Sequence, residues 1–159
     1  MTESIHKHTL SNGMILLAQP MKNVESASYT FLLPAGAGRQ PDGQCGITTV
    51  LNDWLFRGAG DYSSRQLMEE LDHIGLHRYS SILAQNVTYT GTLLAANLEK
   101  ALELYADILL RPALELEEFE KSRQLAIHEL EALDDDPRQK VMLALNENFY
   151  PHPLGKSTV

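Results

Sequence analysis

The stretch SASYTFLLPAGAGRQPDGQCGITTVLNDWLFRGAG, residues 26–60, decides the fold, because it changes from a strand pattern to a helix pattern across one loop. Ser26 to Leu33 places Tyr29, Phe31 and Leu33 on one face, as a half-buried strand does. Pro34-Ala35-Gly36-Ala37-Gly38 cannot continue that strand. Apolar residues then recur at helical spacing at Ile47, Val50, Leu51, Trp54 and Leu55. We expect Leu51, Trp54 and Leu55 to be buried between this helix and a sheet.

Further strands and helices are predicted on both sides of this stretch. Ile5 to Leu10 and Met14 to Ala18 flank Ser11-Asn12-Gly13, and Asn-Gly between two such runs indicates a β-hairpin. After the first helix, Ser63-Ser64 is a good N-cap for a second. Two strands are expected at about 77–83 and 86–94, and helices at 97–110, about 115–133 and about 137–149. This order predicts an α+β fold in which helices pack on a sheet.

Composition excludes several classes of function. The 159 residues suit one domain, 1–159, and their formal net charge of −8 argues against a nucleic-acid or anionic membrane partner. The single cysteine, Cys45, excludes a disulfide framework and a cysteine-rich zinc cluster. No apolar run is long enough to span a bilayer, so we expect a cytoplasmic location. Tyr150 to Val159 contains no closing element, which favours a fragment of a longer multi-domain chain.

Residue spacing alone predicts no catalytic site. His6 and His8 provide two imidazoles, which alone do not make a zinc site. His73 and His77 are separated by Gly75, where a helix is expected to end. Gly36-Ala37-Gly38 is not followed by a phosphate-binding pattern, and the sequence contains no nucleophile-elbow motif.

Several separated motifs nevertheless resemble one known family. They are Leu10-Ser11-Asn12-Gly13-Met14, Ala35-Gly36-Ala37-Gly38-Arg39, Gly46 to Gly58, Ala126 to Glu131, Asp135-Asp136-Pro137 and His152-Pro153-Leu154-Gly155. In this order and spacing they resemble the N-terminal domain of the pitrilysin, or M16, metallopeptidases, which include the mitochondrial processing peptidases and insulin-degrading enzyme. The resemblance covers almost the whole chain and implies an α+β fold with a mixed, mostly antiparallel sheet and helices packed on one face.

The resemblance also implies where a metal site would lie. Active members carry H-x-x-E-H on the first helix, where two histidines bind zinc and the glutamate is the general base. Matched by position, the histidines fall on Thr49 and Asp53 and the base falls on Asn52. A later glutamate ligand falls on Glu129, and an accessory glutamate falls on Ser122. These replacements predict a degenerate site with no catalytic residue, no metal and no cofactor.

The expected function is therefore that of a non-catalytic M16-like domain, a peptide-binding or partner subunit of a processing peptidase. Its partners would be a peptide or an active M16 subunit, and a homo-oligomer is a further option. In the family an edge strand pairs with the substrate backbone, and it falls here on Tyr79, Ser80, Ser81, Ile82, Leu83, Ala84 and Gln85. Two alternatives remain open: a divergent zinc metallopeptidase, and a protein interaction module on the same fold.

Overall fold

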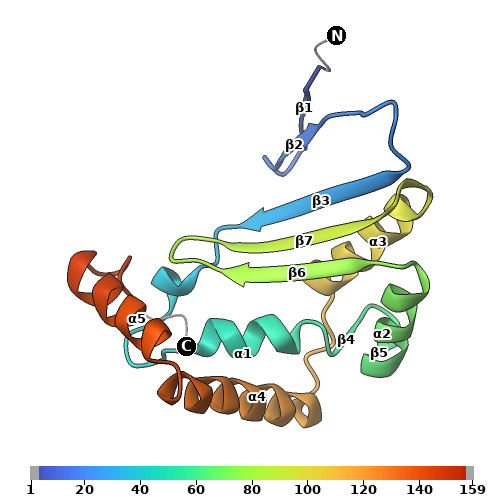
Figure 1. Ribbon diagram of the computed structural model, residues 1–159. Helices are drawn as coiled ribbons and strands as arrows, with labels where there is room; N and C mark the ends of the chain where they lie inside the picture. Colours follow the sequence, from blue (N-terminus) through green and yellow to red (C-terminus); the bar gives the residue numbers. More distant parts are fainter. Residues whose placement is uncertain (1–3, 157–159) are drawn as a thin grey trace.

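A three-stranded antiparallel sheet forms the centre of the structure, a computed structural model that describes residues 4–156. Its strand order is β3 (Ser26–Leu33), β7 (Val87–Leu94) and β6 (His77–Ile82). Two short sheets pair β1 (His6–Thr9) with β2 (Ile15–Ala18) and β4 (Gly58–Ala59) with β5 (Tyr62–Ser63). The α-helices are α1 (Ile47–Trp54), α2 (Ser64–His73), α3 (Leu98–Leu110), α4 (Leu116–Asp134) and α5 (Pro137–Phe149). Short 3-10 helices cover Ala37–Arg39 and Ala95–Asn97. The predicted α+β class is confirmed, and so is the order of the predicted elements, to which the structure adds the short strands β4 and β5 (Figure 1).

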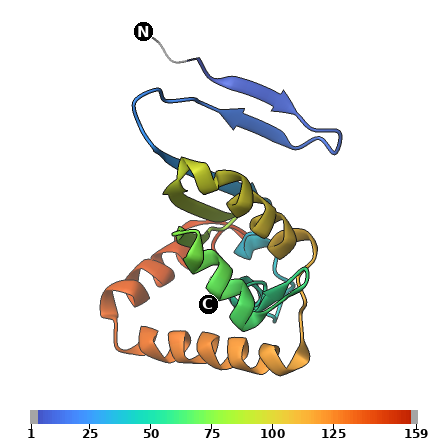
Figure 2. The ribbon, with the colours of Figure 1, turned by 90° about the vertical axis from the view of Figure 1, so that its right-hand side faces the viewer.

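The predicted hairpin forms but does not join the central sheet. The Asn12 side chain accepts a hydrogen bond from the Met14 amide at 3.0 Å, and Gly13 has a φ of 86°, which favours glycine. Every residue of β1 and β2 is exposed. Figure 2 shows the hairpin standing apart from the rest of the chain.

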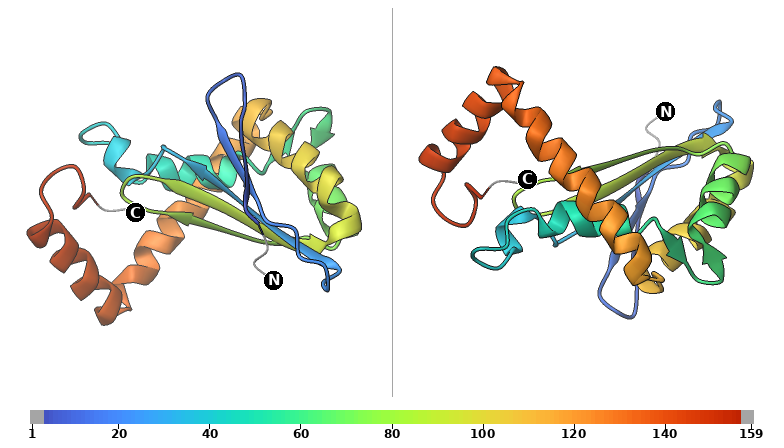
Figure 3. Two further views of the ribbon diagram at one scale, coloured as in Figure 1. Left: turned by 90° about the horizontal axis from the view of Figure 1, so that it is seen from above. Right: turned by 90° about the horizontal axis from the view of Figure 1, so that it is seen from below.

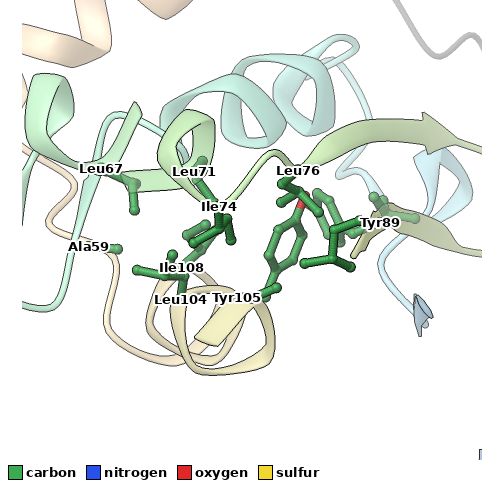
Figure 4. Close-up of a cluster of buried hydrophobic side chains, with 12 residues drawn as sticks. Ala59, Leu67, Leu71, Ile74, Leu76, Tyr89, Leu104, Tyr105 and Ile108 are labelled. Carbon is green, nitrogen blue, oxygen red and sulfur yellow. The ribbon is translucent and has the colours of Figure 1, made fainter. Parts of the chain in front are cut away.

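The hydrophobic core lies on one face of the sheet, beneath α2 and α3. Tyr89 on β7 and Tyr105 on α3 are almost fully buried and belong to one cluster with Leu67, Leu71, Leu104 and Ile108 (Figure 4). Tyr105 is stacked against Phe31, at 5.9 Å between ring centroids, and meets Tyr29 edge-on at 5.2 Å. Aromatic pairs of this kind stabilise a core beyond the area that they bury. Of the capping signals, Ser63 forms the expected N-cap, as part of a capping box with Gln66.

The expected burial of the first helix against the sheet is wrong for two of its three residues. Leu51 is 42% exposed. Trp54 packs edge-on against Phe119 of α4, with the ring centroids 4.9 Å apart, and its indole N–H donates to the Glu115 carbonyl at 3.0 Å. Leu55 alone packs against the core. Helix α1 therefore lies between the sheet and α4, and its apolar residues divide between two partners (Figure 1).

The proposed edge strand is shorter than predicted. β6 ends at Ile82, and Leu83, Ala84 and Gln85 form the turn into β7. Their carbonyls accept hydrogen bonds from the amides of Ala37, Gly38 and Gly36, respectively, at 2.9, 2.7 and 3.2 Å. A Cβ on Gly36 would lie 2.3 Å from the Leu83 carbonyl oxygen, so only glycine fits there. The backbone of residues 83–85 is thus already paired, and an added strand could use only β6.

Helices α4 and α5 carry much of the exposed apolar surface. α5 leaves α4 at a sharp angle and projects past the sheet (Figure 3). Leu116 on α4 is 81% exposed and Phe149 on α5 is 72% exposed. Further exposed apolar side chains on the two helices are Leu125, Ile127, Leu130, Val141, Met142 and Leu145. A surface of this kind is typical of a site of association.

Candidate functional site

A cavity of about 680 Å³ opens between α1, β6 and α4. It is lined by Thr49, Asn52 and Asp53 from α1 and by Ser122 and Glu129 from α4. The α1 residues have i, i+3 and i+4 spacing, which places them on one helical face. Ser122 and Glu129 are two helical turns apart on α4 and share a face for the same reason. The structure therefore brings all five predicted site positions to one cavity.

An ion-pair network joins α1 to α4 along this cavity. Arg57, which follows α1, donates from Nε to Asp53 Oδ2 at 2.6 Å and to Ser122 Oγ at 2.8 Å. The Ser122 hydroxyl is fully buried and donates to the same Asp53 oxygen at 2.6 Å. A weaker contact of 3.4 Å joins Arg57 Nη1 to Glu118 Oε2. The Asp53 carboxylate is thus held by a guanidinium and a hydroxyl.

Neighbouring charges and hydrogen bonds shift the pKa values of two members of this network, Arg57 and Glu118. Burial lowers the pKa of Arg57, but the hydrogen bonds and charges of Asp53 and Glu118 outweigh this effect, and the pKa is raised overall. A hydrogen bond from Lys121, together with Arg57, lowers the pKa of the Glu118 carboxyl. Both shifts favour the charged forms of Arg57 and Glu118.

Asn52, at the position of the general base, is tied to the edge strand. Its side-chain amide N–H donates to Ser80 Oγ on β6 at 3.0 Å. A carboxamide has no carboxylate that could take a proton from water near neutral pH. The contact instead links α1 to β6 through two residues that both line the cavity.

The side chains around this cavity do not fit a zinc ion. Within residues 4–156, no three histidine, cysteine, aspartate or glutamate side chains lie close enough together to hold a metal. Zinc sites in proteins normally offer three or four such ligands. Of the matched positions only Asp53 and Glu129 carry a ligating carboxylate, and that of Asp53 is already paired with Arg57.

The outward-facing backbone of β6 can be identified from the strand register. The Leu83 amide donates to the Asn86 carbonyl at 2.8 Å, so that facing pair is hydrogen-bonded. Facing pairs alternate in an antiparallel ladder, which makes Ser81–Thr88 and Tyr79–Thr90 the bonded pairs with β7. The N–H and C=O groups of Arg78, Ser80 and Ile82 therefore point away from β7. Among the described strands, none pairs with that edge.

Sequence reasoning missed two arginines that line the cavity. Arg57 is four residues after Asp53, the helical spacing of an ion pair, and this signal could have identified it. Arg78 has no such local signal, because its place on the cavity wall depends on how β6 pairs with β7. Within residues 4–156, no helix is both long enough and apolar enough to cross a membrane.

Comparison with known proteins identifies a family. The family model for insulinase, peptidase family M16, matches residues 16–159. A relative from Rickettsia bellii named uncharacterized zinc protease is 30% identical over 157 residues, which are 98% of this chain and 38% of the relative. The β subunit of the mitochondrial processing peptidase of Saccharomyces cerevisiae is 26% identical over 93% of this chain and 32% of the subunit. The chain therefore spans only about a third of the length of these relatives.

Solved structures show the same fold. A protease from Helicobacter pylori superposes with a TM-score of 0.89 at 21% identity, over 99% of this chain and 38% of that one. A structure described as a peptidase M16 inactive domain, from Pseudomonas fluorescens, superposes with a TM-score of 0.84 at 16% identity, over 98% of this chain and 38% of that one. The predicted α+β fold, with helices packed on a mostly antiparallel sheet, is thus the fold of M16 peptidase domains.

Proposed function

The chain belongs to the insulinase family, peptidase family M16, and from this premise we propose that it is a non-catalytic member that binds extended peptide without cutting it. The observation that carries the proposal is the pairing of Asp53 with Arg57 and Ser122. In an active site of this family that position would offer an imidazole to zinc. Here that position holds the Asp53 carboxylate, which accepts hydrogen bonds from the Arg57 guanidinium and the Ser122 hydroxyl.

Peptide binding is supported by the free edge of β6. The outward N–H and C=O groups of Arg78, Ser80 and Ile82 lie beside the cavity, and an extended peptide can pair with such groups as an added strand. Strand addition requires only main-chain donors and acceptors. It therefore does not depend on a metal ligand or a general base.

Association with a second M16-type domain is the other part of the proposal. Relatives of this chain are named as β subunits of the mitochondrial processing peptidase. The exposed apolar residues of α4 and α5 supply a surface that such a domain, in the same chain or in a separate subunit, would cover.

The test measures binding and cleavage on the same labelled peptide. Synthetic peptides of about eight residues, rich in threonine and valine, are titrated with the chain by fluorescence polarisation, and the mixtures are then analysed for cut products by mass spectrometry. We expect saturable binding and intact peptide. Ser80→Pro should abolish binding, because it removes an outward donor. Ser80→Ala is the matched control, since it loses the contact with Asn52 but keeps the donor. Cut peptide that disappears with Glu129→Ala would support a divergent peptidase instead.

A further inference from the structure

Four charged side chains line the cavity, and only two of them neutralise each other. Asp53 and Arg57 form the ion pair described above. Arg78 on β6 and Glu129 on α4 also line the cavity. Within residues 4–156, neither of these two has an oppositely charged side chain within ion-pair distance. The cavity therefore keeps one uncompensated cation on its strand wall and one uncompensated anion on its helix wall.

Arg78 is held in place by uncharged groups. Its guanidinium carbon lies 5.5 Å from the centroid of the Phe56 ring, and Nη2 contacts the Met68 sulfur at 3.1 Å. The ring and the sulfur orient the guanidinium but leave most of its five N–H donors without a protein acceptor. A fork of this geometry matches a carboxylate.

The register then places Arg78 opposite one residue of an added strand. The side chains of Arg78, Ser80 and Ile82 share the cavity face of β6, because they are two residues apart. The same residues expose the main-chain groups with which a peptide would pair. A peptide residue bonded to Arg78 would thus direct its side chain to the face where the guanidinium lies.

We propose that this cavity selects extended peptides that carry an acidic side chain opposite Arg78. The inference rests on the proposed binding of peptide to β6 and adds the chemical class of that peptide. Glu129, on the wall that α4 forms, repels an anion that approaches α4, and so it favours the register in which the acidic residue stays beside β6. Peptide residues at alternate positions from the acidic one would face Ser80 and Ile82, which suit a small and an apolar side chain respectively.

The experiment uses three labelled peptides of about eight residues that differ only in one central residue, which is glutamate, glutamine or lysine. Dissociation constants are measured for the wild-type chain, for Arg78→Glu and for Arg78→Gln. Arg65→Glu is the matched control, because this substitution changes the net charge by the same amount as Arg78→Glu. Arg65 is 88% exposed on α2 and does not line the cavity. Circular dichroism checks that each variant is folded.

For the wild type we expect the glutamate peptide to bind about threefold more tightly than the glutamine peptide, and the lysine peptide to bind most weakly. Arg78→Glu should reverse the order of the glutamate and lysine peptides, Arg78→Gln should remove the preference, and Arg65→Glu should leave it unchanged. Equal affinities for all three peptides would overturn the charge selection and leave peptide binding intact. Failure of every peptide to bind the wild type would overturn both proposals. If Arg78→Glu does not fold, loss of the preference in Arg78→Gln still decides the question.

Discussion

The ion pair between Arg57 and Asp53 should contribute measurably to folding stability, and a double-mutant cycle can isolate its contribution. The variants are Arg57→Met, Asp53→Asn and the double variant, with the free energy of unfolding taken from urea titrations. The chain contains a matched control in Arg65→Met and Glu69→Gln. Both pairs have i, i+4 spacing, with N···O distances of 2.6 and 2.7 Å.

The two pairs differ in burial, and this difference sets the expected magnitudes. The side chains of Arg57 and Asp53 are 23% and 31% exposed, whereas those of Arg65 and Glu69 are 88% and 60% exposed. An exposed i, i+4 pair contributes about 0.3–0.5 kcal/mol, and breaking a fully buried pair costs about 3–5 kcal/mol. Arg57 and Asp53 lie between these limits and share the buried Ser122 hydroxyl, so we expect a coupling energy of about 1–2 kcal/mol.

Salt concentration gives a second criterion. Raising the ionic strength should reduce the coupling of Arg65 with Glu69 more, in proportion, than that of Arg57 with Asp53, because solvent ions screen exposed charges best. A coupling energy for Arg57 and Asp53 no larger than that of the exposed pair would refute the reasoning. It would mean that the network does not hold the carboxylate in place.

Two further predictions concern the core and the helix interface. Burial raises the pKa values of Tyr29 and Tyr105 and raises that of Tyr89 to about 12. These tyrosines therefore ionise at a lower pH in the unfolded chain than in the folded one. The free energy of unfolding should consequently fall as the pH rises from about 10 through about 12. Urea titrations across this range should show a shallower loss in Tyr89→Phe than in Tyr79→Phe, since Tyr79 is exposed; identical slopes would contradict the assignment. Trp54→Ala should lower the free energy of unfolding by about 2 kcal/mol and weaken the docking of α4, because the indole packs on Phe119 and bonds to the Glu115 carbonyl. A cost below about 0.5 kcal/mol would show that this contact contributes little.

Local signals predicted the elements well, because each depends on residues close in sequence. The Asn12-Gly13 turn and the Ser63 cap satisfy backbone groups within a few residues of themselves. Contacts between distant segments were not predictable in this way. Trp54 was assigned to the sheet because nothing near it in sequence indicates that Phe119 lies beside it. The strand expected to reach Gln85 ends at Ile82 because the loop at Gly36 to Gly38 pairs with the turn.

The candidate site shows the same division between local and distant information. The family resemblance placed Thr49, Asn52, Asp53 and Glu129 at the positions of a metal site, and the structure brings all four to one cavity. The resemblance says only which residues are replaced. The spacing of four residues indicates the pairing of Asp53 with Arg57, but the contact of Ser122 with the same carboxylate depends on how α1 packs against α4, which no spacing rule contains.

Zinc content tests the central claim most directly. The purified chain and the variant Thr49→His/Asn52→Glu/Asp53→His, which restores H-x-x-E-H, are dialysed together against trace zinc and analysed for bound metal. The account predicts well under about 0.1 zinc per wild-type chain and a clear gain in the restored variant, where imidazoles replace the hydroxyl and the carboxylate paired with Arg57. About one tightly bound zinc per wild-type chain, lost on Glu129→Ala, would contradict it.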